Sequence, residues 1–182
     1  EVLGLSWIEM KEIPQFFEHL LKKVKISIIK GNHDGGIERI LPKGVEVHDS
    51  KGFVISDVGF THGNAWPDEK LLDAEYLIAG HLHPAVEFWS SGVRVTEHCW
   101  VKCEIDSKRL EKKYRRKSSL KTGIIVPTFN HLKGGVALNS KEFQPNKTND
   151  PLLNNEIFKW KKSEIFLLDG TFLGKLDEIK IR

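Results

Sequence analysis

The sequence predicts an α/β protein whose strands end at one shared edge of a sheet. The apolar, β-branched run Ile26–Ile29 follows a segment with helical spacing and ends in a polar turn, Lys30–Gly36. Two later apolar runs end in similar turns, Thr61-His62-Gly63 and Gly80-His81-Leu82-His83-Pro84. A helix followed by a strand is half of a βαβ crossover, and open α/β sheets bind ligands beyond the carboxyl ends of their strands. We therefore expect the three polar turns to lie on one rim.

The helical elements are predicted from apolar spacing and from proline signals. Apolar residues recur every three or four positions over Trp7–Val24, where Pro14 is expected to kink or restart the helix because proline lacks an N–H group. Ile37–Leu41 and Pro67–Leu72 are expected to form short helices or turns, the second opened by its proline. The basic stretch Ser107–Lys121 is expected to form a polar helix or loop.

The strands are predicted from short apolar runs that lie between turn signals. In chain order they are Val24–Lys30, Val45–Val47, Gly52–Ile55, Val58–Thr61, Tyr76–Gly80, Ala85–Trp89, Val93–Ile105, Gly123–Phe129, Glu164–Leu168 and Thr171–Ile181. Turns at Ser90-Ser91-Gly92 and Asp169-Gly170 predict two hairpins. The second half of the chain is therefore expected to be antiparallel.

Length and composition indicate a single domain over residues 1–182, with 40% hydrophobic and 29% charged residues. No apolar run approaches the roughly 18 residues of a membrane-spanning helix, and no signal peptide is recognisable. We expect a cytoplasmic protein with no membrane partner. The first residue is Glu1 rather than Met, so we expect the true start to lie upstream. A net charge of +3 does not identify a nucleic-acid partner, but it excludes a strongly acidic surface that would repel one.

The two cysteines, Cys99 and Cys103, lie four residues apart in a predicted strand and so share one face of it. We interpret them as small buried side chains in a reducing compartment, in preference to a metal or redox site.

The residues that can carry chemistry follow the predicted strand ends. Asn32, His62, His81 and His83 supply an amide oxygen and three imidazoles, a donor set that suits Mn, Fe or Zn. His81 and His83 are two residues apart, so in a straight strand both would lie on the same side. Each turn also contains glycine, which allows the backbone to approach a ligand closely.

The remaining polar residues of the first turn are His33 and Asp34. Asp34 is expected to orient His33 by a hydrogen bond, as carboxylates beside metal sites commonly do. Taken alone, an Asn-His-Asp turn that only hydrogen-bonds to itself accounts for this loop equally well.

The ordered motifs Gly-Asn-His-Asp, Thr-His-Gly and Gly-His-Leu-His together resemble those of the calcineurin-like metallophosphoesterase superfamily. Further segments look like the archaeal SbcD-related branch of phosphoesterases: Pro127–Asn130, Gly134-Gly135 and Leu168–Gly174. The resemblance covers nearly the whole chain. It implies a four-layer α/β/β/α sandwich and, for this chain, one that lacks its first βαβ strands.

The resemblance also implies two divalent metal ions, Mn²⁺ foremost and Fe or Zn as alternatives, and hydrolysis of phosphodiesters by a metal-activated water. Asn32, His62 and His81 would ligate one ion and His83 the other. Nucleic acid is one possible substrate and DNA repair one possible setting, while an ATPase or helicase partner stays unknown.

The resemblance implies that the catalytic residues lie in the first turn, Lys30–Gly36. His33 would contact the phosphoryl oxygen or assist the leaving group, with Asp34 holding its orientation. The family's Asp-x-His and Gly-Asp motifs do not occur in the chain and would fall before Glu1. We therefore expect the isolated chain to bind at most one metal ion weakly and to turn over poorly.

Two segments lie outside these motifs. The basic segment 107–121 is interpreted as an insertion with a solvated face, with contact to a phosphate backbone as the alternative. The segment 139–155 is expected to be a mobile surface loop. His131 is a weaker candidate for lining the cleft. The alternative function is that of a non-catalytic module that binds nucleic acid or a protein partner and retains a relic of the fold.

Overall fold

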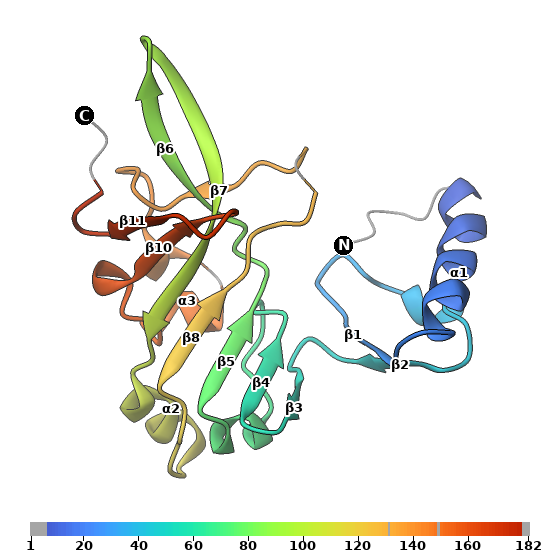
Figure 1. Ribbon diagram of the computed structural model, residues 1–182. Coiled ribbons are helices and arrows are strands. Elements are labelled where there is room, and N and C mark those ends of the chain that lie inside the picture. The colour runs from blue at the N-terminus through green and yellow to red at the C-terminus, as the bar shows by residue number, and fades with distance from the viewer. Residues whose placement is uncertain (1–6, 131, 149, 180–182) are drawn as a thin grey trace.

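Nine strands form one large mixed sheet in the computed structural model, which describes residues 7–130, 132–148 and 150–179 (Figure 1). Its strand order is β11-β10-β7-β8-β5-β4-β3, with β6 paired to β7 and β9 paired to β6. The strands are β3 (Phe53–Ile55), β4 (Val58–Thr61), β5 (Tyr76–Ala79), β6 (Pro84–Ser90), β7 (Val93–Glu104), β8 (Thr122–Ile125), β9 (Val136–Ala137), β10 (Glu164–Leu167) and β11 (Phe172–Lys175). A separate parallel pair contains β1 (Ile26–Ile29) and β2 (Val45–His48). The predicted α/β class is confirmed.

Helices are few and mostly short in the described residues. They are α1 (Trp7–Leu21), α2 (Ser107–Tyr114), α3 (Pro151–Asn154) and the 3₁₀ helices η1 (Ile37–Arg39), η2 (Glu69–Asp73), η3 (Pro145–Lys147) and η4 (Trp160–Lys162). The helix α1 and the β1–β2 pair lie to one side of the large sheet (Figure 1). No helix among the described residues is long and apolar enough to cross a membrane.

The middle of the large sheet is parallel, which fixes where its strand ends meet. β4 pairs with β5 in parallel, with Thr61 opposite Ala79, and β5 pairs with β8 in parallel, with Ala79 opposite Ile125. The outer strands β3 and β7 are antiparallel to these neighbours. The carboxyl ends of β4, β5 and β8 therefore share one edge. The sequence predicted this for β4 and β5, but the strand before the first polar turn, β1, belongs to the separate pair.

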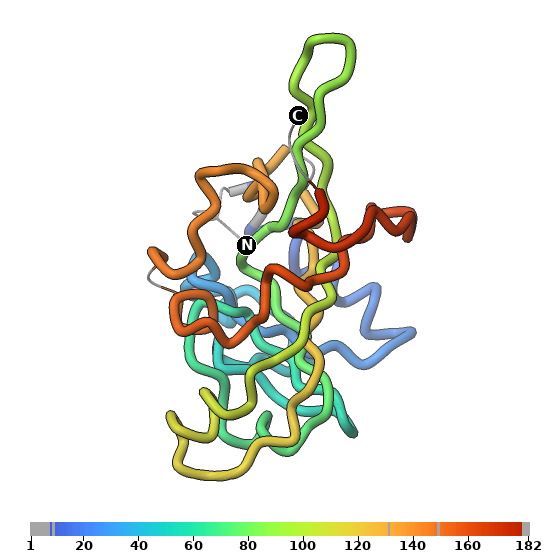
Figure 2. Tube along the Cα trace, turned by 90° about the vertical axis from the view of Figure 1, so that its left-hand side faces the viewer, coloured from blue at the N-terminus to red at the C-terminus, as the bar shows by residue number. Residues whose placement is uncertain are grey.

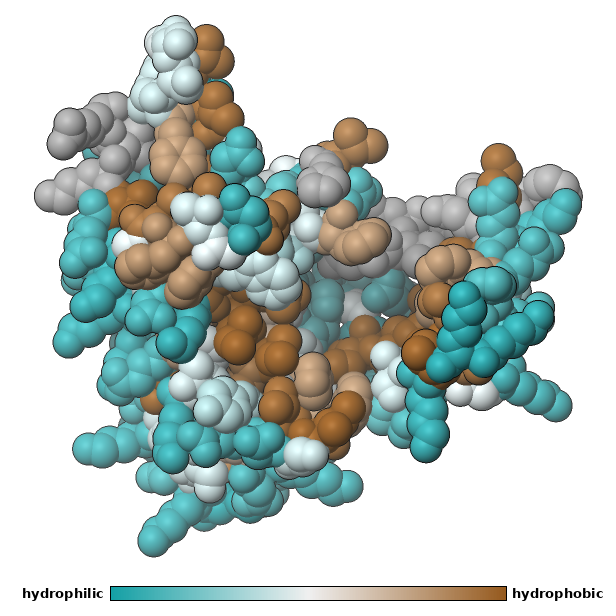
Figure 3. Space-filling view, viewed as in Figure 1, coloured by the Kyte–Doolittle hydropathy of each residue, from teal (hydrophilic) through white to brown (hydrophobic). Residues whose placement is uncertain are grey.

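One face of this sheet is the main core, because alternate residues of each strand point to opposite faces. Leu77, Val101 and Ile165 are fully buried on it, and they join helix residues such as Leu152 in one cluster. The opposite face is also apolar but only partly covered in the described residues, and Figure 3 shows it as brown side chains across β8, β5, β4 and β3.

Both cysteines lie in the core, as predicted. Cys99 is fully buried and Cys103 is 3% exposed. Burial raises the pKa of each thiol to about 12, because a thiolate is poorly solvated there. The Cys103 thiol also donates to the Gly123 carbonyl (3.5 Å). These side chains are packing residues.

The long hairpin β6–β7 stands out from the body in both views (Figures 1 and 2). Its strands pair from Ala85 opposite His98 to Ser90 opposite Val93, and the turn falls at Ser91-Gly92 as predicted. Trp89 near the tip is half exposed, with the Arg94 guanidinium 5.8 Å from its ring centroid.

Several predicted boundaries are wrong. The first helix ends at Leu21 rather than Val24, and it runs through Pro14. The strand predicted to reach Phe129 ends at Ile125, two residues before Pro127, which cannot donate a ladder hydrogen bond. The last strand ends at Lys175, where the hydrogen bonds of a turn replace the ladder.

The segment 139–155 has more structure than was expected of a loop. It contains η3 and α3, and Leu152 and Leu153 of α3 are buried in the core. Mobility of this segment stays a prediction. His131, suggested as a cleft residue, lies outside the described residues.

Candidate metal centre

Three strand ends carry the predicted ligands to one place. Asn32 follows β1, His62 follows β4 directly, and His81 lies two residues beyond the end of β5. The parallel register of β4 and β5 sets Thr61 beside Ala79, so that the two histidines leave the sheet at neighbouring points. The neighbouring positions of His62 and His81 are therefore a consequence of strand direction and register, whereas Asn32 comes from the separate β1–β2 pair.

The polar atoms of these side chains converge closely. His62 Nε2 lies 3.1 Å from Asn32 Oδ1 and 3.2 Å from His81 Nδ1. The two imidazole rings meet edge to face, with centroids 5.0 Å apart. Three side chains that are up to 49 residues apart in sequence, from Asn32 to His81, thus meet around one imidazole nitrogen.

The hydrogen positions follow from what each atom can donate or accept. An amide oxygen only accepts, so His62 Nε2–H donates to Asn32 Oδ1. The other nitrogen of His81, Nε2, lies 2.9 Å from Asp150 Oδ1, which also accepts. His81 therefore carries its proton on Nε2, and its Nδ1 lone pair faces the same His62 N–H. One proton is shared between two acceptors.

This donor set fits a divalent transition metal. Two ligand atoms about 2.1 Å from one ion and at right angles lie about 3.0 Å apart, close to the two separations seen between these donors. Within the described ranges, no group of three or more His, Cys, Asp or Glu side chains could hold an ion. An ion at this point would therefore need the Asn32 amide as well as the two imidazoles.

The first turn approaches His62 so closely that any side chain at position 31 would displace the His62 ring or the turn. A Cβ there would lie 2.7 Å from His62 Cε1 and 2.9 Å from His62 Nε2. The turn is tied by the Gly31 N–H, which donates to Asp34 Oδ2 (2.7 Å). The structure shows the internal hydrogen bond that the sequence offered as one interpretation of this loop, and it places Asn32 of the same loop beside His62.

The catalytic pair predicted in this turn is placed as follows. His33 is exposed on the turn, whereas Asp34 is 7% exposed. The hydrogen bond from Gly31 shows Asp34 holding the turn that presents Asn32. The orientation of His33 by Asp34 stays a prediction.

The backbone departs from a straight strand after β5. His81 has φ of 66° and His83 has φ of 49°, both in the left-handed region that non-glycine residues rarely adopt. Such conformations cluster at functional sites. The contacts that define the cluster involve His81, whereas His83 lies at the start of β6, where its carbonyl accepts from the Val136 N–H (2.8 Å).

Asp150 is a residue that sequence reasoning missed. It comes from the segment 139–155, which had been expected to be a mobile loop, and it contacts His81 across 69 positions of the chain. An Asp-Pro pair before two leucines is a helix-start signal, but nothing local points to His81.

A groove of about 670 Å³ opens beside this pair. His81 and Asp150 lie on its wall, and the apolar part of its lining includes Leu82 and Phe143. Its polar lining comes from Ser140, Glu142, Gln144, Lys147 and Thr148. The groove thus borders the candidate centre only at His81, on the side of the ring that faces Asp150, and its lining contains one lysine.

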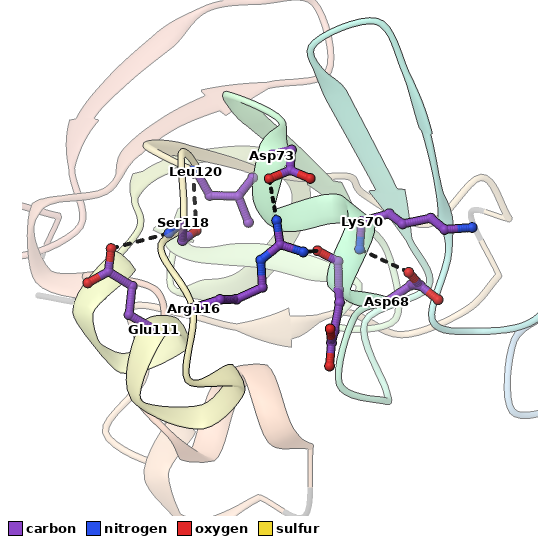
Figure 4. A network of polar contacts seen from close by, with 8 residues as sticks. Asp68, Lys70, Asp73, Glu111, Arg116, Ser118 and Leu120 are labelled. Carbon is purple, nitrogen blue, oxygen red and sulfur yellow. Dashed lines mark hydrogen bonds and ion pairs between the residues drawn. The ribbon is translucent and has the colours of Figure 1, made fainter.

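Part of the positive charge of the basic segment 107–121 is paired with carboxylates. Arg116 pairs with Asp73 (2.5 Å) and also donates to the Glu69 carbonyl, in the network shown in Figure 4. Arg109 pairs with Glu156 and with Asp106 (3.5 Å).

The same segment is also anchored to the body of the protein. Leu110 and Leu120 are fully buried, and the Tyr114 hydroxyl donates to the Pro67 carbonyl. Burial raises the pKa of Tyr114 to about 12. These contacts support the interpretation of this segment as a solvated face.

Comparison of the chain with known proteins adds little to the geometry described above. No family model matches the chain, and no curated protein matches it. One solved structure, the nuclease MPE of Pseudomonas putida, matches with a TM-score of 0.47 and 18% identity. The match covers 89% of this chain and 58% of that one, so this chain spans less than two thirds of its length. A likeness of this size supports no conclusion about function.

Proposed function

We propose that this protein is a metal-dependent phosphoesterase, with Asn32, His62 and His81 holding one divalent ion. The observation that carries this proposal is the convergence of Oδ1, Nε2 and Nδ1 of these residues at separations of 3.1 and 3.2 Å. A cation at that point would replace one shared proton and satisfy all three lone pairs. Mn²⁺ is the first candidate because of the motif resemblance, and Fe or Zn, which imidazole ligands suit, are alternatives.

A bound ion would supply polarisation of the phosphoryl oxygen and a lower pKa of a bound water. In a two-metal site, His83 would hold the second ion. The chain itself supplies the positioning. His33 stands on the exposed side of the same turn, where it can donate a proton to the departing oxygen. Gly31 and Asp34 keep that turn against His62.

The groove beside His81 supports a phosphodiester as the substrate. A diester has a group on each side of its phosphorus, and a groove that borders the centre at His81 offers space for one of them. Lys147 in the groove lining provides a positive charge for a second phosphate, which makes a nucleic-acid strand one candidate. Glu142 in the same lining moderates this charge.

The competing function, a binding module without catalysis, predicts an accessible basic surface. The ion pairs of Arg109 and Arg116 reduce the charge that 107–121 offers to a phosphate backbone. Other cations of this segment, such as Lys112 and Lys117, are exposed, so the measurement of metal-dependent hydrolysis decides between the two functions.

The proposal is tested by Mn²⁺ titration and by hydrolysis of bis-p-nitrophenyl phosphate. We expect Mn²⁺-dependent hydrolysis that falls about 100-fold or more in His81→Ala and in His33→Ala. Only the first variant should also lose metal binding, because His33 is not a proposed ligand. His19→Ala, on the exposed surface of α1, is the matched control and should keep both properties. A wild-type chain with neither Mn²⁺ binding nor Mn²⁺-dependent hydrolysis would contradict the proposal.

A further inference from the structure

The second nitrogen of His81 has a dedicated partner. Asp150 Oδ1 lies 2.9 Å from His81 Nε2, and both side chains are mostly buried, with 20% of His81 and 25% of Asp150 exposed. The imidazole ring separates Asp150 from Asn32 and His62, since these lie on the Nδ1 side. Asp150 therefore does not join the donor cluster itself.

Asp150 is available to His81 because it forgoes a local bond. It occupies the N-cap of α3, where an aspartate side chain usually accepts from the N–H groups of the first turn. No such side-chain hydrogen bond forms here. An N-cap bond is a favourable local contact, and the carboxylate instead makes its contact with a residue 69 positions away.

Packing of α3 fixes the place of this carboxylate. Leu152 and Leu153 are 1% and 4% exposed and belong to the main core. The Asp150 carbonyl accepts from Leu153 (3.1 Å) and Asn154 (2.9 Å), which starts the helix at this residue. Asp150 thus reaches the rim from a rigid element.

We propose that Asp150 is a positioning residue that keeps the His81 proton on Nε2 and turns Nδ1 toward Asn32 and His62. The inference rests on the proposed function, because it treats His81 Nδ1 as a ligand atom. An accepting carboxylate makes the opposite imidazole nitrogen more basic and fixes the ring orientation. Loss of such a partner typically weakens metal binding 10- to 100-fold.

Asp150→Asn is the variant of choice because it keeps the shape of the side chain while removing the charge. Glu142→Gln is the matched control, since Glu142 is a carboxylate in the same groove that is neither a proposed metal ligand nor the partner of His81. By calorimetry, we expect the Mn²⁺ dissociation constant of Asp150→Asn to rise about 10- to 100-fold, and that of Glu142→Gln to change less than about twofold. Equal binding by wild type and Asp150→Asn, or equal losses in the two variants, would overturn the proposal.

A second measurement needs no metal. In the metal-free chain, long-range ¹H–¹⁵N NMR correlations of His81 should place the proton on Nε2, with the N–H protected from exchange. That protection should be lost in Asp150→Ala, which removes the acceptor, whereas the amide oxygen of Asp150→Asn can still accept this bond. A proton on Nδ1 in the wild type would refute the role of Asp150 whatever the metal result. Failure of the wild type to bind Mn²⁺ would instead count against the proposed function, and the NMR result would still decide the inference.

Discussion

Substitution of Gly31 by alanine tests whether the first turn sets the geometry of the centre. The added Cβ would lie 2.7 Å from His62 Cε1, whereas carbon atoms in good contact are about 3.5–4.0 Å apart. Either His62 or the turn must therefore move by roughly 0.8 Å or more. A shift of this size removes His62 Nε2 from its present separations of 3.1 and 3.2 Å to the other two donors.

The cost in stability should be small although the cost in function is large. The clashing atoms belong to the tip of a side chain, which can swing aside, so the free energy of unfolding should fall by only about 1 kcal/mol, the lower end for overpacking. A misplacement near 1 Å in a catalytic group can cost about 100-fold in rate. We expect Gly31→Ala to weaken Mn²⁺ binding at least tenfold and to lower kcat/KM for bis-p-nitrophenyl phosphate about 100-fold.

The same turn provides the control. A Cβ added at Gly35 meets no atom within 4 Å, and its backbone is not left-handed. Gly35→Ala should therefore retain wild-type binding and rates, which calorimetry, the hydrolysis assay and urea unfolding can compare side by side. If Gly31→Ala bound Mn²⁺ as tightly as Gly35→Ala, the close approach to His62 would have no part in the site.

Other expected outcomes follow from burial and backbone conformation. Cys99 and Cys103 should resist a thiol reagent until the chain is unfolded, and fast labelling of the native chain would contradict their burial. The free energy of unfolding should fall as pH rises from 9 toward about 12, because in that range only the unfolded chain releases the thiol protons. Leu110→Ala, at a fully buried position, should lower the free energy of unfolding in urea by about 2–5 kcal/mol. Arg116→Ala, which breaks an exposed ion pair, should lower it by about 1 kcal/mol or less. Similar losses in the two variants would be inconsistent with the burial of Leu110. His83→Gly should be more stable than His83→Ala by about 1 kcal/mol, since φ is 49°, and the opposite order would argue against the left-handed backbone.

The existence of most strands and the neighbouring ends of β4 and β5 were predictable because their signals are local. An apolar run that stops at Gly-Asn or Gly-His identifies a strand end without knowledge of its neighbours. The parallel pairing of β4, β5 and β8 then brings those ends together. The buried pair Cys99 and Cys103 was predictable for the same reason, since alternation along β7 depends on local spacing.

Asp150 was not predictable because its role depends on contacts made far along the chain. The residues around it are polar and contain proline, which is typical of a surface loop. Leu152 and Leu153 nevertheless bury α3 in the core and place the carboxylate beside His81. Burial of these two leucines holds the segment against the core. The average composition of 139–155 is polar and therefore does not reveal their contribution.

The two histidines of Gly-His-Leu-His show where local spacing stops being informative. The expectation that His81 and His83 lie on one side assumed a straight strand, in which alternate side chains share a face. The backbone is left-handed at both residues, and β5 has already ended at Ala79. The direction of each ring is then set by its own partners, which for His81 are His62 on one nitrogen and Asp150 on the other. The side chains of this rim are therefore positioned by tertiary contacts, and their roles have to be tested one residue at a time.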